Sequence, residues 1–233
     1  MSFSKLAILL PGFLDSPDYP HLVELDKELT RLGYEVVRVN PTGTWEPNAD
    51  FNQYSMSHIL GQVNDIVSQH PNHTIIAAGH SLGGMMSMLS AINNHSVSAA
   101  ISIMGPSSFV RPEKYQERVV EWKKLPYKTS TRDLPENPQK TRKLKIPYSF
   151  VEDSLQYNVA DTINSITKPL LFIAGEKDAL ISTDHIKSIY KRANQPKALI
   201  IIKGIGHDYR KHPDEIKLVN KQVITFLHDQ HLC

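Results

Sequence analysis

Short apolar runs recur along the chain at intervals that suit buried β-strands. Several of them are apolar at successive positions rather than at alternate ones, as in strands that are covered on both faces of a sheet. Six segments are therefore expected to be strands: Leu6–Leu10, Tyr34–Val39, Thr74–Ala78, Val97–Met104, Pro169–Ala174 and Ala198–Ile202.

Longer stretches with a helical spacing of apolar residues separate the strands. Gly33 follows the first of these stretches and suits a helix C-terminal cap. Strands that alternate with helices predict an α/β protein, with about six mostly parallel strands and helices on both faces. The predicted helices are His21–Leu32, Gln53–Gln69, Gly83–Asn93, Thr183–Ala193 and Glu215–His228.

The alternation is interrupted between the fourth and the fifth strand. Residues 107–150 contain many prolines and eleven Lys or Arg against five Asp or Glu, which gives this segment a net charge of +6. The rest of the chain has 15 basic and 19 acidic residues and carries −4. We predict one domain over residues 1–233 with an insertion at about 107–160. Its charge has two interpretations, attraction of anionic substrates or an ordinary solvated surface.

Composition limits the class of protein. The chain has 233 residues, of which 40% are apolar and 21% charged, which suits a single folded domain. A formal net charge of +2 gives no indication of nucleic-acid binding. Cys233 is the only cysteine, so a disulfide framework is excluded. The N-terminal apolar run is too short for a signal sequence, and no run is long enough to span a membrane. We expect a cytoplasmic protein.

Ser81 lies in the sequence Gly-His-Ser-Leu-Gly, directly after a predicted strand and before a predicted helix. In that context the pattern Gly-x-Ser-x-Gly predicts a nucleophilic serine on a sharp turn. The glycines at 79 and 83 avoid collisions with the neighbouring strand and helix. The start of the helix directs free N–H groups and its positive dipole end at the serine, which favours a negatively charged oxygen there.

A serine hydroxyl needs a base to take its proton, and the base needs a carboxylate to orient it. Asp178 follows the fifth strand and His207 follows the sixth, so both are expected at the same sheet edge as Ser81. We predict Ser81, Asp178 and His207 as catalytic residues. Asp208 is expected to point away from Ser81. Weaker alternatives are Glu176, Asp184 and His212.

An oxyanion hole needs two N–H donors. One is expected to be the backbone N–H of Leu82, which follows the serine. The other is expected to be the backbone N–H of Phe13, in the loop Pro11-Gly12-Phe13 after the first strand. Gly12 permits a sharp turn there, although Pro-Gly is also common in ordinary turns.

The motifs LLPGF, GHSLGG, GEKD and GIGH together make the chain resemble the α/β-hydrolase superfamily along nearly its whole length. The most similar members are small esterases, monoacylglycerol-lipase-like enzymes and serine aminopeptidase-like enzymes. The resemblance implies family roles for Ser81, Asp178 and His207, and a lid at the insertion. In these members a histidine usually precedes the glycine of the first motif and supports its loop, whereas this chain has Pro11.

Four residues are candidates for contact with the substrate. Leu14, Trp45, Met104 and Ile181 lie near strand ends and are candidate pocket residues, although Trp45 could equally pack under the lid. No His, Cys or Asp cluster has metal-ligand spacing and no phosphate-binding glycine motif is present, so we expect no metal and no cofactor.

The predicted function is hydrolysis of a small-molecule carboxylic ester through an acyl-enzyme. Two alternatives remain open. The same three residues could cleave amides, as in a peptidase, or thioesters. The protein could also be a non-catalytic binder on a hydrolase scaffold. The sequence does not determine the oligomeric state or the physiological substrate.

Overall fold

Six parallel strands form the central sheet of this computed structural model, which describes residues 4–110 and 116–233. The strand order is β2-β1-β3-β4-β7-β8. The α/β fold class is confirmed, and the strands lie where the apolar runs predicted them. Their bounds are β1 Lys5–Leu10, β2 Tyr34–Arg38, β3 Thr74–His80, β4 Val97–Ile103, β7 Leu170–Gly175 and β8 Lys197–Ile202.

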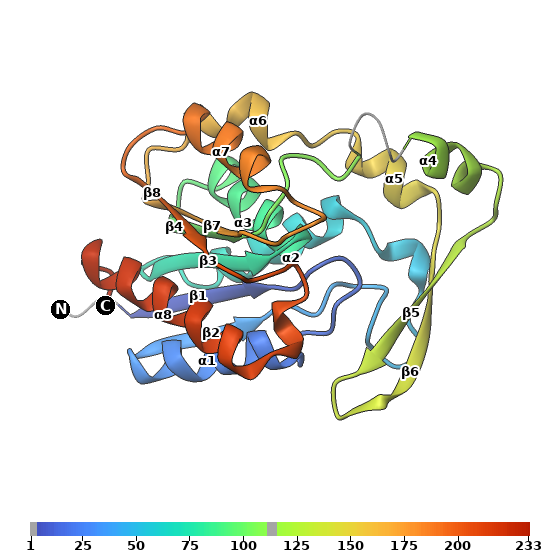
Figure 1. Cartoon of the computed structure of the whole chain (residues 1–233), viewed down its shortest axis with the longest axis horizontal. Helices are drawn as coiled ribbons and strands as arrows, with labels where there is room; N and C mark the ends of the chain where they lie inside the picture. The colour runs from blue at the N-terminus through green and yellow to red at the C-terminus, as the bar shows by residue number, and fades with distance from the viewer. Residues whose placement is uncertain (1–3, 111–115) are drawn as a thin grey trace.

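Helices cover both faces of the sheet (Figure 1). On one face lie α1 (Pro20–Arg31) and α8 (Pro213–Asp229). On the other lie α2 (Met56–Ser68), α3 (Leu82–Asn93) and α7 (Thr183–Arg192). Successive side chains of β1 alternate between the two cores, as the two-residue period of a strand requires.

The helix predicted from Gln53 begins instead at Met56. The hydroxyl of Ser55 accepts the N–H of His58, which caps the helix at that point. A short 3₁₀ helix over Phe51–Gln53 precedes it. The apolar spacing runs through both segments, so the cap rather than the periodicity sets the boundary.

Strand order determines where a site can form. β1 lies between β2 and β3, so the chain leaves β1 toward one edge of the sheet and leaves β3 toward the other. The carboxyl ends of β1 and β3 therefore border a topological switch point, where open α/β sheets bind ligands. Leu10 pairs in register with Gly79, which brings the loop after β1 beside the turn at Ser81.

The insertion between β4 and β7 contains a β-hairpin that the sequence did not predict. Its strands are β5 (Lys128–Leu134) and β6 (Asn137–Ile146), which pair antiparallel in a separate sheet at the edge of the molecule (Figure 1). The hairpin has few apolar positions, so hydrophobic alternation gave no signal for it. Flanking it are α4 (Gln116–Lys123), α5 (Ser149–Ser154) and α6 (Val159–Thr162).

We call residues 107–160 the lid, of which 111–115 lie outside the described residues. The lid packs on the main core through Leu144 and Ile146 of β6 and through Trp122 of α4, all buried. The indole N–H of Trp122 donates to the Ile146 carbonyl at 3.0 Å, which joins α4 to the hairpin. In the described ranges, no helix combines the length and the apolar character needed to cross a membrane.

Candidate active site

Ser81 occupies the tight turn between β3 and α3, with a backbone φ of 54° and ψ of −119°. Such a conformation costs on the order of 1–3 kcal/mol for a residue with a side chain, so its surroundings must hold it. The Ser81 N–H donates to the Ile103 carbonyl of β4 at 2.9 Å, and the Ser81 carbonyl accepts the N–H of Met85 at 3.1 Å. The serine is thereby held at the N-terminal end of α3.

Glycine is required on both sides of Ser81. A Cβ atom on Gly83 would lie 1.9 Å from the carbonyl oxygen of Leu10, and a Cβ on Gly79 would lie 2.4 Å from the carbonyl carbon of Gly83. Both obstacles are backbone atoms, which cannot rotate away. These contacts give the physical reason for the Gly-x-Ser-x-Gly pattern in this chain.

His207 contacts both Ser81 and Asp178. Its Nε2 lies 2.9 Å from Ser81 Oγ, and its Nδ1 lies 2.7 Å from Asp178 Oδ2. A carboxylate beside Nδ1 requires a proton on that nitrogen, which leaves Nε2 to accept the serine proton. The three side chains that the sequence singled out are therefore brought together at the carboxyl edge of the sheet.

The Asp178 side chain is fully buried and its orientation is fixed by backbone bonds. Its second oxygen, Oδ1, accepts the N–H groups of Leu180 and Ile181, each at 2.8 Å. These two bonds satisfy one carboxylate oxygen and leave the other directed at His207. The loop after β7 thus sets the tilt of the imidazole.

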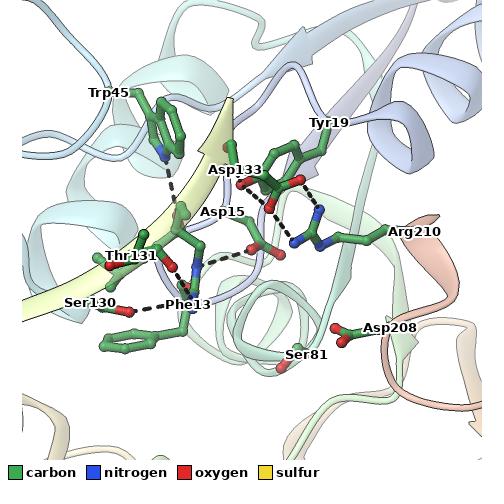
Figure 2. Close-up of polar contacts among 12 residues, drawn as sticks. Phe13, Asp15, Tyr19, Trp45, Ser81, Ser130, Thr131, Asp133, Asp208 and Arg210 are labelled. Atoms are coloured by element: carbon green, nitrogen blue, oxygen red, sulfur yellow. Dashed lines mark hydrogen bonds and ion pairs between the residues drawn. The ribbon is translucent and has the colours of Figure 1, made fainter. Parts of the chain in front are cut away.

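The alternative acids and histidine lie elsewhere. Glu176 accepts the N–H of Gly204 at 2.9 Å, Asp184 pairs with Lys187 at 3.0 Å on the surface, and His212 is the N-cap of α8. Asp208 differs from its expectation, because it lines the same cavity as Ser81 instead of lying away from it (Figure 2). It directly follows His207, in the same loop.

Phe13 and Leu82 are the predicted oxyanion donors. Phe13 lies in the loop after β1, and Leu82 is the first residue of α3, next to the switch point. Both residues line one cavity with Ser81 and His207. Within the described part of the chain, neither backbone N–H is donated to a protein acceptor. Asp15 N–H donates to the Gly12 carbonyl at 3.0 Å, which closes the turn that Gly12 was expected to make.

The cavity over Ser81 has a volume of about 500 Å³ and lies between the sheet edge and the lid. One wall is apolar and comes mainly from the lid and from the loop after β7. The polar part of the lining, which we call the polar wall, comes from β5 and from the residues after His207. The apolar wall contains Phe109, Val119, Trp122, Ile146, Leu180 and Ile181, and the polar wall contains Ser130, Thr131, Arg132, Asp133, Asp208 and Arg210.

Of the four candidate pocket residues, the structure places only Ile181 on the cavity wall. Leu14 is buried in the core with a φ of 59°, and Met104 is fully buried in the core that faces α8. Trp45 packs beneath the lid, where the Arg142 guanidinium lies 5.5 Å from its ring centre. Proximity to a strand end was thus not enough to predict the direction of these side chains.

Comparison with known proteins decides the family. A family model described as "Serine aminopeptidase, S33" matches residues 8–214. The chain belongs to this family. The rat mitochondrial palmitoyl-protein thioesterase ABHD10 is 23% identical over 208 residues, which cover 89% of this chain and 67% of that protein. The mouse ABHD10 protein is 21% identical over 212 residues, covering 91% and 71%.

Solved structures show the same fold. Mouse ABHD10 aligns with a TM-score of 0.76 at 19% identity, covering 96% of this chain and 90% of its own. Est1E from Butyrivibrio proteoclasticus, with ferulic acid bound, aligns with a TM-score of 0.73 at 23% identity, covering 98% and 90%. A monoacylglycerol lipase from Paleococcus ferrophilus aligns with a TM-score of 0.75 at 15% identity, covering 98% and 97%. The resemblance to α/β hydrolases is confirmed.

This serine aminopeptidase family member also has a buried polar cluster behind the cavity that the sequence did not reveal. Asp15, His21 and His80 are all buried. The ring centre of His80 lies 4.7 Å from that of His207 and 5.5 Å from that of His21. Burial and the nearby Arg210 guanidinium lower the pKa of His21 to about 3. Burial also lowers the pKa of His80 well below its usual value, so an uncharged His80 lies beside His207.

Among the described residues, this cluster is the group whose ligand atoms lie close enough for a metal ion, within 4.8 Å of one another. The electrostatics of this cluster oppose the binding of a metal ion. Arg210 is near enough to lower the pKa of both histidines, and a charge that repels a proton also repels a metal cation. Burial raises the pKa of Asp15, which weakens it as an anionic ligand. We assign no metal to these residues.

A second set of residues that sequence reasoning missed joins the lid to this hydrolase site. Asp133 of β5 accepts two N–H groups from Arg210, at 2.8 and 3.1 Å, and the Tyr19 hydroxyl donates to the Asp133 carbonyl at 2.9 Å (Figure 2). These bonds connect positions 77 and 114 residues apart in the chain. The only signal in the sequence was the high density of charged residues in the lid.

Proposed function

We propose that this protein is a serine hydrolase that cleaves carboxylic esters through an acyl-enzyme. The observation that carries the proposal is the continuous chain of hydrogen bonds from Ser81 through His207 to Asp178. A nucleophile, a base and an orienting carboxylate in this order form the arrangement of the Ser-His-Asp hydrolases. Membership of the serine aminopeptidase family supports hydrolase activity.

In the proposed reaction the Ser81 hydroxyl attacks the ester carbonyl while His207 Nε2 takes its proton. Asp178 keeps the other imidazole proton on Nδ1 and stabilises the imidazolium that forms. His207 then donates the proton to the leaving alcohol. Water attacks the acyl-enzyme by the same route, with His207 again as base, and Ser81 is regenerated.

The tetrahedral intermediate carries a negative oxygen, which the N–H groups of Phe13 and Leu82 would bind. Removal of one such donor typically lowers kcat about 10²- to 10³-fold. The uncharged state of His80 supports the transfer of the Ser81 proton to His207, because a second positive charge beside His207 would disfavour protonation of its imidazole.

The cavity is consistent with a small-molecule substrate, since about 500 Å³ lies within the usual range of small-molecule sites. Acidic and basic side chains line the cavity in nearly equal number, three Asp against four Lys or Arg. Arg210 pairs with Asp133, and Arg132 lies 3.7 Å from an oxygen of Asp15. The charge pattern therefore does not single out an anionic substrate.

Thioester hydrolysis is a second candidate. The curated relatives named above are palmitoyl-protein thioesterases, and an acyl-enzyme intermediate serves ester and thioester cleavage equally. Cleavage of amides is a third use of the same residues. Rates on matched ester, acyl-thioester and aminoacyl-amide substrates with a common acyl group would rank the three.

The decisive experiment is the hydrolysis of a short p-nitrophenyl ester by the wild type and by Ser81→Ala. The variant is expected to lose hydrolysis while keeping the wild-type circular dichroism spectrum. Ser90→Ala is the matched control, because Ser90 is a buried serine of α3, the helix that follows Ser81, and its hydroxyl donates to the Met86 carbonyl. Hydrolysis that survives in Ser81→Ala would refute the assignment.

Covalent labelling separates this proposal from the binding-protein alternative. A fluorophosphonate probe reacts with an activated serine, so the wild type is expected to be labelled at Ser81 and Ser81→Ala is not. A wild-type protein that stays unlabelled would favour a non-catalytic binder.

A further inference from the structure

The peptide group between Phe13 and Leu14 is held from both ends. Its carbonyl oxygen, on Phe13, accepts a hydrogen bond from Nη2 of Arg132 at 2.9 Å. Its N–H, on Leu14, donates to the Tyr54 hydroxyl at 3.1 Å. Leu14 has a φ of 59°, a left-handed conformation that a residue with a side chain adopts only when its surroundings impose it.

Arg132 reaches this peptide from the lid. It lies on β5, and its guanidinium also donates to the Ser130 hydroxyl at 3.3 Å. Its Nε lies 3.7 Å from an oxygen of Asp15, which is an ion-pair contact and too long for a hydrogen bond. We call residues 11–15 the oxyanion loop. The Arg132 side chain is 26% exposed, so most of its surface is covered where β5 meets this loop.

The side chain that supports the oxyanion loop comes from outside the loop. In the related hydrolases that the sequence resembles, a histidine within the loop itself supports the turn, and this chain has Pro11 at that position. Proline lacks a backbone N–H and a polar side chain, so it offers no such bond. In this structure a side chain 119 residues away bonds the loop instead.

Asp133, the residue after Arg132 on β5, bonds a second segment next to the cavity. Successive side chains of a strand point to opposite faces, and Asp133 accordingly turns away from the oxyanion loop toward Arg210 and Tyr19 (Figure 2). Pairing between β5 and β6 is irregular directly after Asp133, as expected where a strand is redirected toward a site. Arg132 and Asp133 thus bond the oxyanion loop and the segment after His207 from one short piece of the lid.

We infer that Arg132 is a positioning residue that sets the direction of the Phe13 N–H, so that the oxyanion hole is complete only while the lid hairpin is docked. The inference rests on the proposed function. Arg132 holds the carbonyl of residue 13 and thereby limits rotation of the adjoining peptide that carries the Phe13 N–H. Loss of this bond is expected to weaken binding of the transition state more than binding of the substrate.

The test compares Arg132→Ala with Arg142→Ala. Arg142 is directly opposite Arg132 in the hairpin and also donates to two backbone carbonyls, those of Trp45 at 3.0 Å and Glu46 at 3.1 Å. Both variants remove one lid arginine and its bonds to a loop, but only Arg132 bonds the Phe13 carbonyl. The measurements are kcat and KM on short p-nitrophenyl esters, and the Kd of a boronic acid that forms a tetrahedral adduct with serine.

Arg132→Ala is expected to lower kcat roughly 10- to 100-fold with little change in KM, as for a misplaced catalytic group. Its affinity for the boronic acid is expected to fall by the same factor as kcat/KM. Arg142→Ala is expected to change kcat much less. Arg132→Lys, which keeps one donor for the Phe13 carbonyl, is expected to be intermediate, and it replaces Arg132→Ala, with Arg142→Lys as control, if the alanine variant does not fold.

Equal losses of kcat in the two arginine variants would overturn the inference, because they would indicate a general weakening of the lid. A rise in KM alone, or an effect that depends strongly on the acyl group, would overturn it in favour of direct substrate contact by Arg132. If the wild type neither hydrolyses esters nor reacts with a fluorophosphonate at Ser81, the proposed function itself fails and this inference fails with it.

Discussion

Asp133 of the lid and Arg210 of the segment after His207 form a two-point ion pair, with N···O distances of 2.8 and 3.1 Å. Planar guanidinium and carboxylate groups match in this geometry, which makes such pairs stronger than single-contact ones. Arg210 is three residues from His207, so the pair ties the lid to the loop that carries the proposed base.

Asp133→Asn is expected to lower the stability of the folded protein at neutral pH. The hydrogen bond from Arg210 holds the pKa of Asp133 at about 2, below its ordinary value of 3.8. A group with a lowered folded-state pKa stabilises the fold above its unfolded pKa, and this stabilisation disappears as pH falls through the folded value. Urea unfolding at several pH values is therefore expected to show a wild-type advantage that is full above pH 4 and shrinks toward pH 2. A pH-independent difference would contradict this explanation.

Asp178→Asn is expected to lower kcat by about 10⁴-fold, as for loss of the orienting carboxylate in comparable enzymes, because the amide no longer fixes the proton on Nδ1 of His207. The fold is expected to survive, since an amide oxygen can still accept the N–H groups of Leu180 and Ile181. Ester hydrolysis with matched circular dichroism spectra measures both effects. Asp208→Asn, which changes an acid of the same cavity outside the hydrogen-bond chain, serves as control.

Gly83→Ala is expected to prevent the native turn, because the new Cβ would lie 1.9 Å from the Leu10 carbonyl oxygen. Gly61→Ala is the contrasting substitution. Gly61 lies inside α2, and a Cβ added there would meet no neighbouring atom within 4 Å, so alanine is expected to stabilise the protein by roughly 0.5–1 kcal/mol. Soluble yield and thermal unfolding distinguish the two. A well-folded Gly83→Ala protein would show that the close approach of β1 to α3 is not required.

Stability is expected to fall below about pH 6.5 because of the buried histidines. His21 has a pKa of about 3 in the folded protein and an ordinary pKa of 6.5 when unfolded, so protons bind preferentially to the unfolded chain between these values. The fold has its full stability from this group above pH 6.5 and loses about 2 kcal/mol of it by pH 5.

His21→Leu removes this titration, so its unfolding free energy is expected to fall less than that of the wild type between pH 7 and pH 5. Asp15, His80 and Arg210 remain in both proteins, and their contributions largely cancel in the comparison. Chemical denaturation at the two pH values measures the difference. Identical pH dependence in the two proteins would show that His21 does not titrate on unfolding in this range.

The sheet and the proposed catalytic residues were predictable because their signals are local. Most strands of the sheet contain a run of successive apolar residues. Ser81 is marked by Gly79 and Gly83, and close backbone contacts require glycine at both positions. Asp178 and His207 each follow a strand of the sheet, and parallel strands bring their carboxyl ends to one edge. Strand order was not needed to infer that these residues meet.

The lid and the polar wall of the cavity were not predictable, because they depend on contacts between distant segments. The lid strands are largely polar, so their pairing is set by docking rather than by a hydrophobic pattern. The contacts of Arg132 with the Phe13 carbonyl and of Asp133 with Arg210 join chain positions 119 and 77 residues apart. No local pattern indicates which charged residue of a basic segment will find a partner.

The amino-acid sequence alone therefore determined the fold class, the family resemblance and the three residues proposed for the chemistry. These features depend on short-range steric requirements and on the hydrophobicity of single strands, and both can be identified directly from the order of the residues. Only the tertiary structure decided which side chains form the cavity, which histidines are buried and uncharged, and how the lid reaches the oxyanion loop. Those features depend on the direction and environment of each side chain, and both arise only when the layers of the fold pack together.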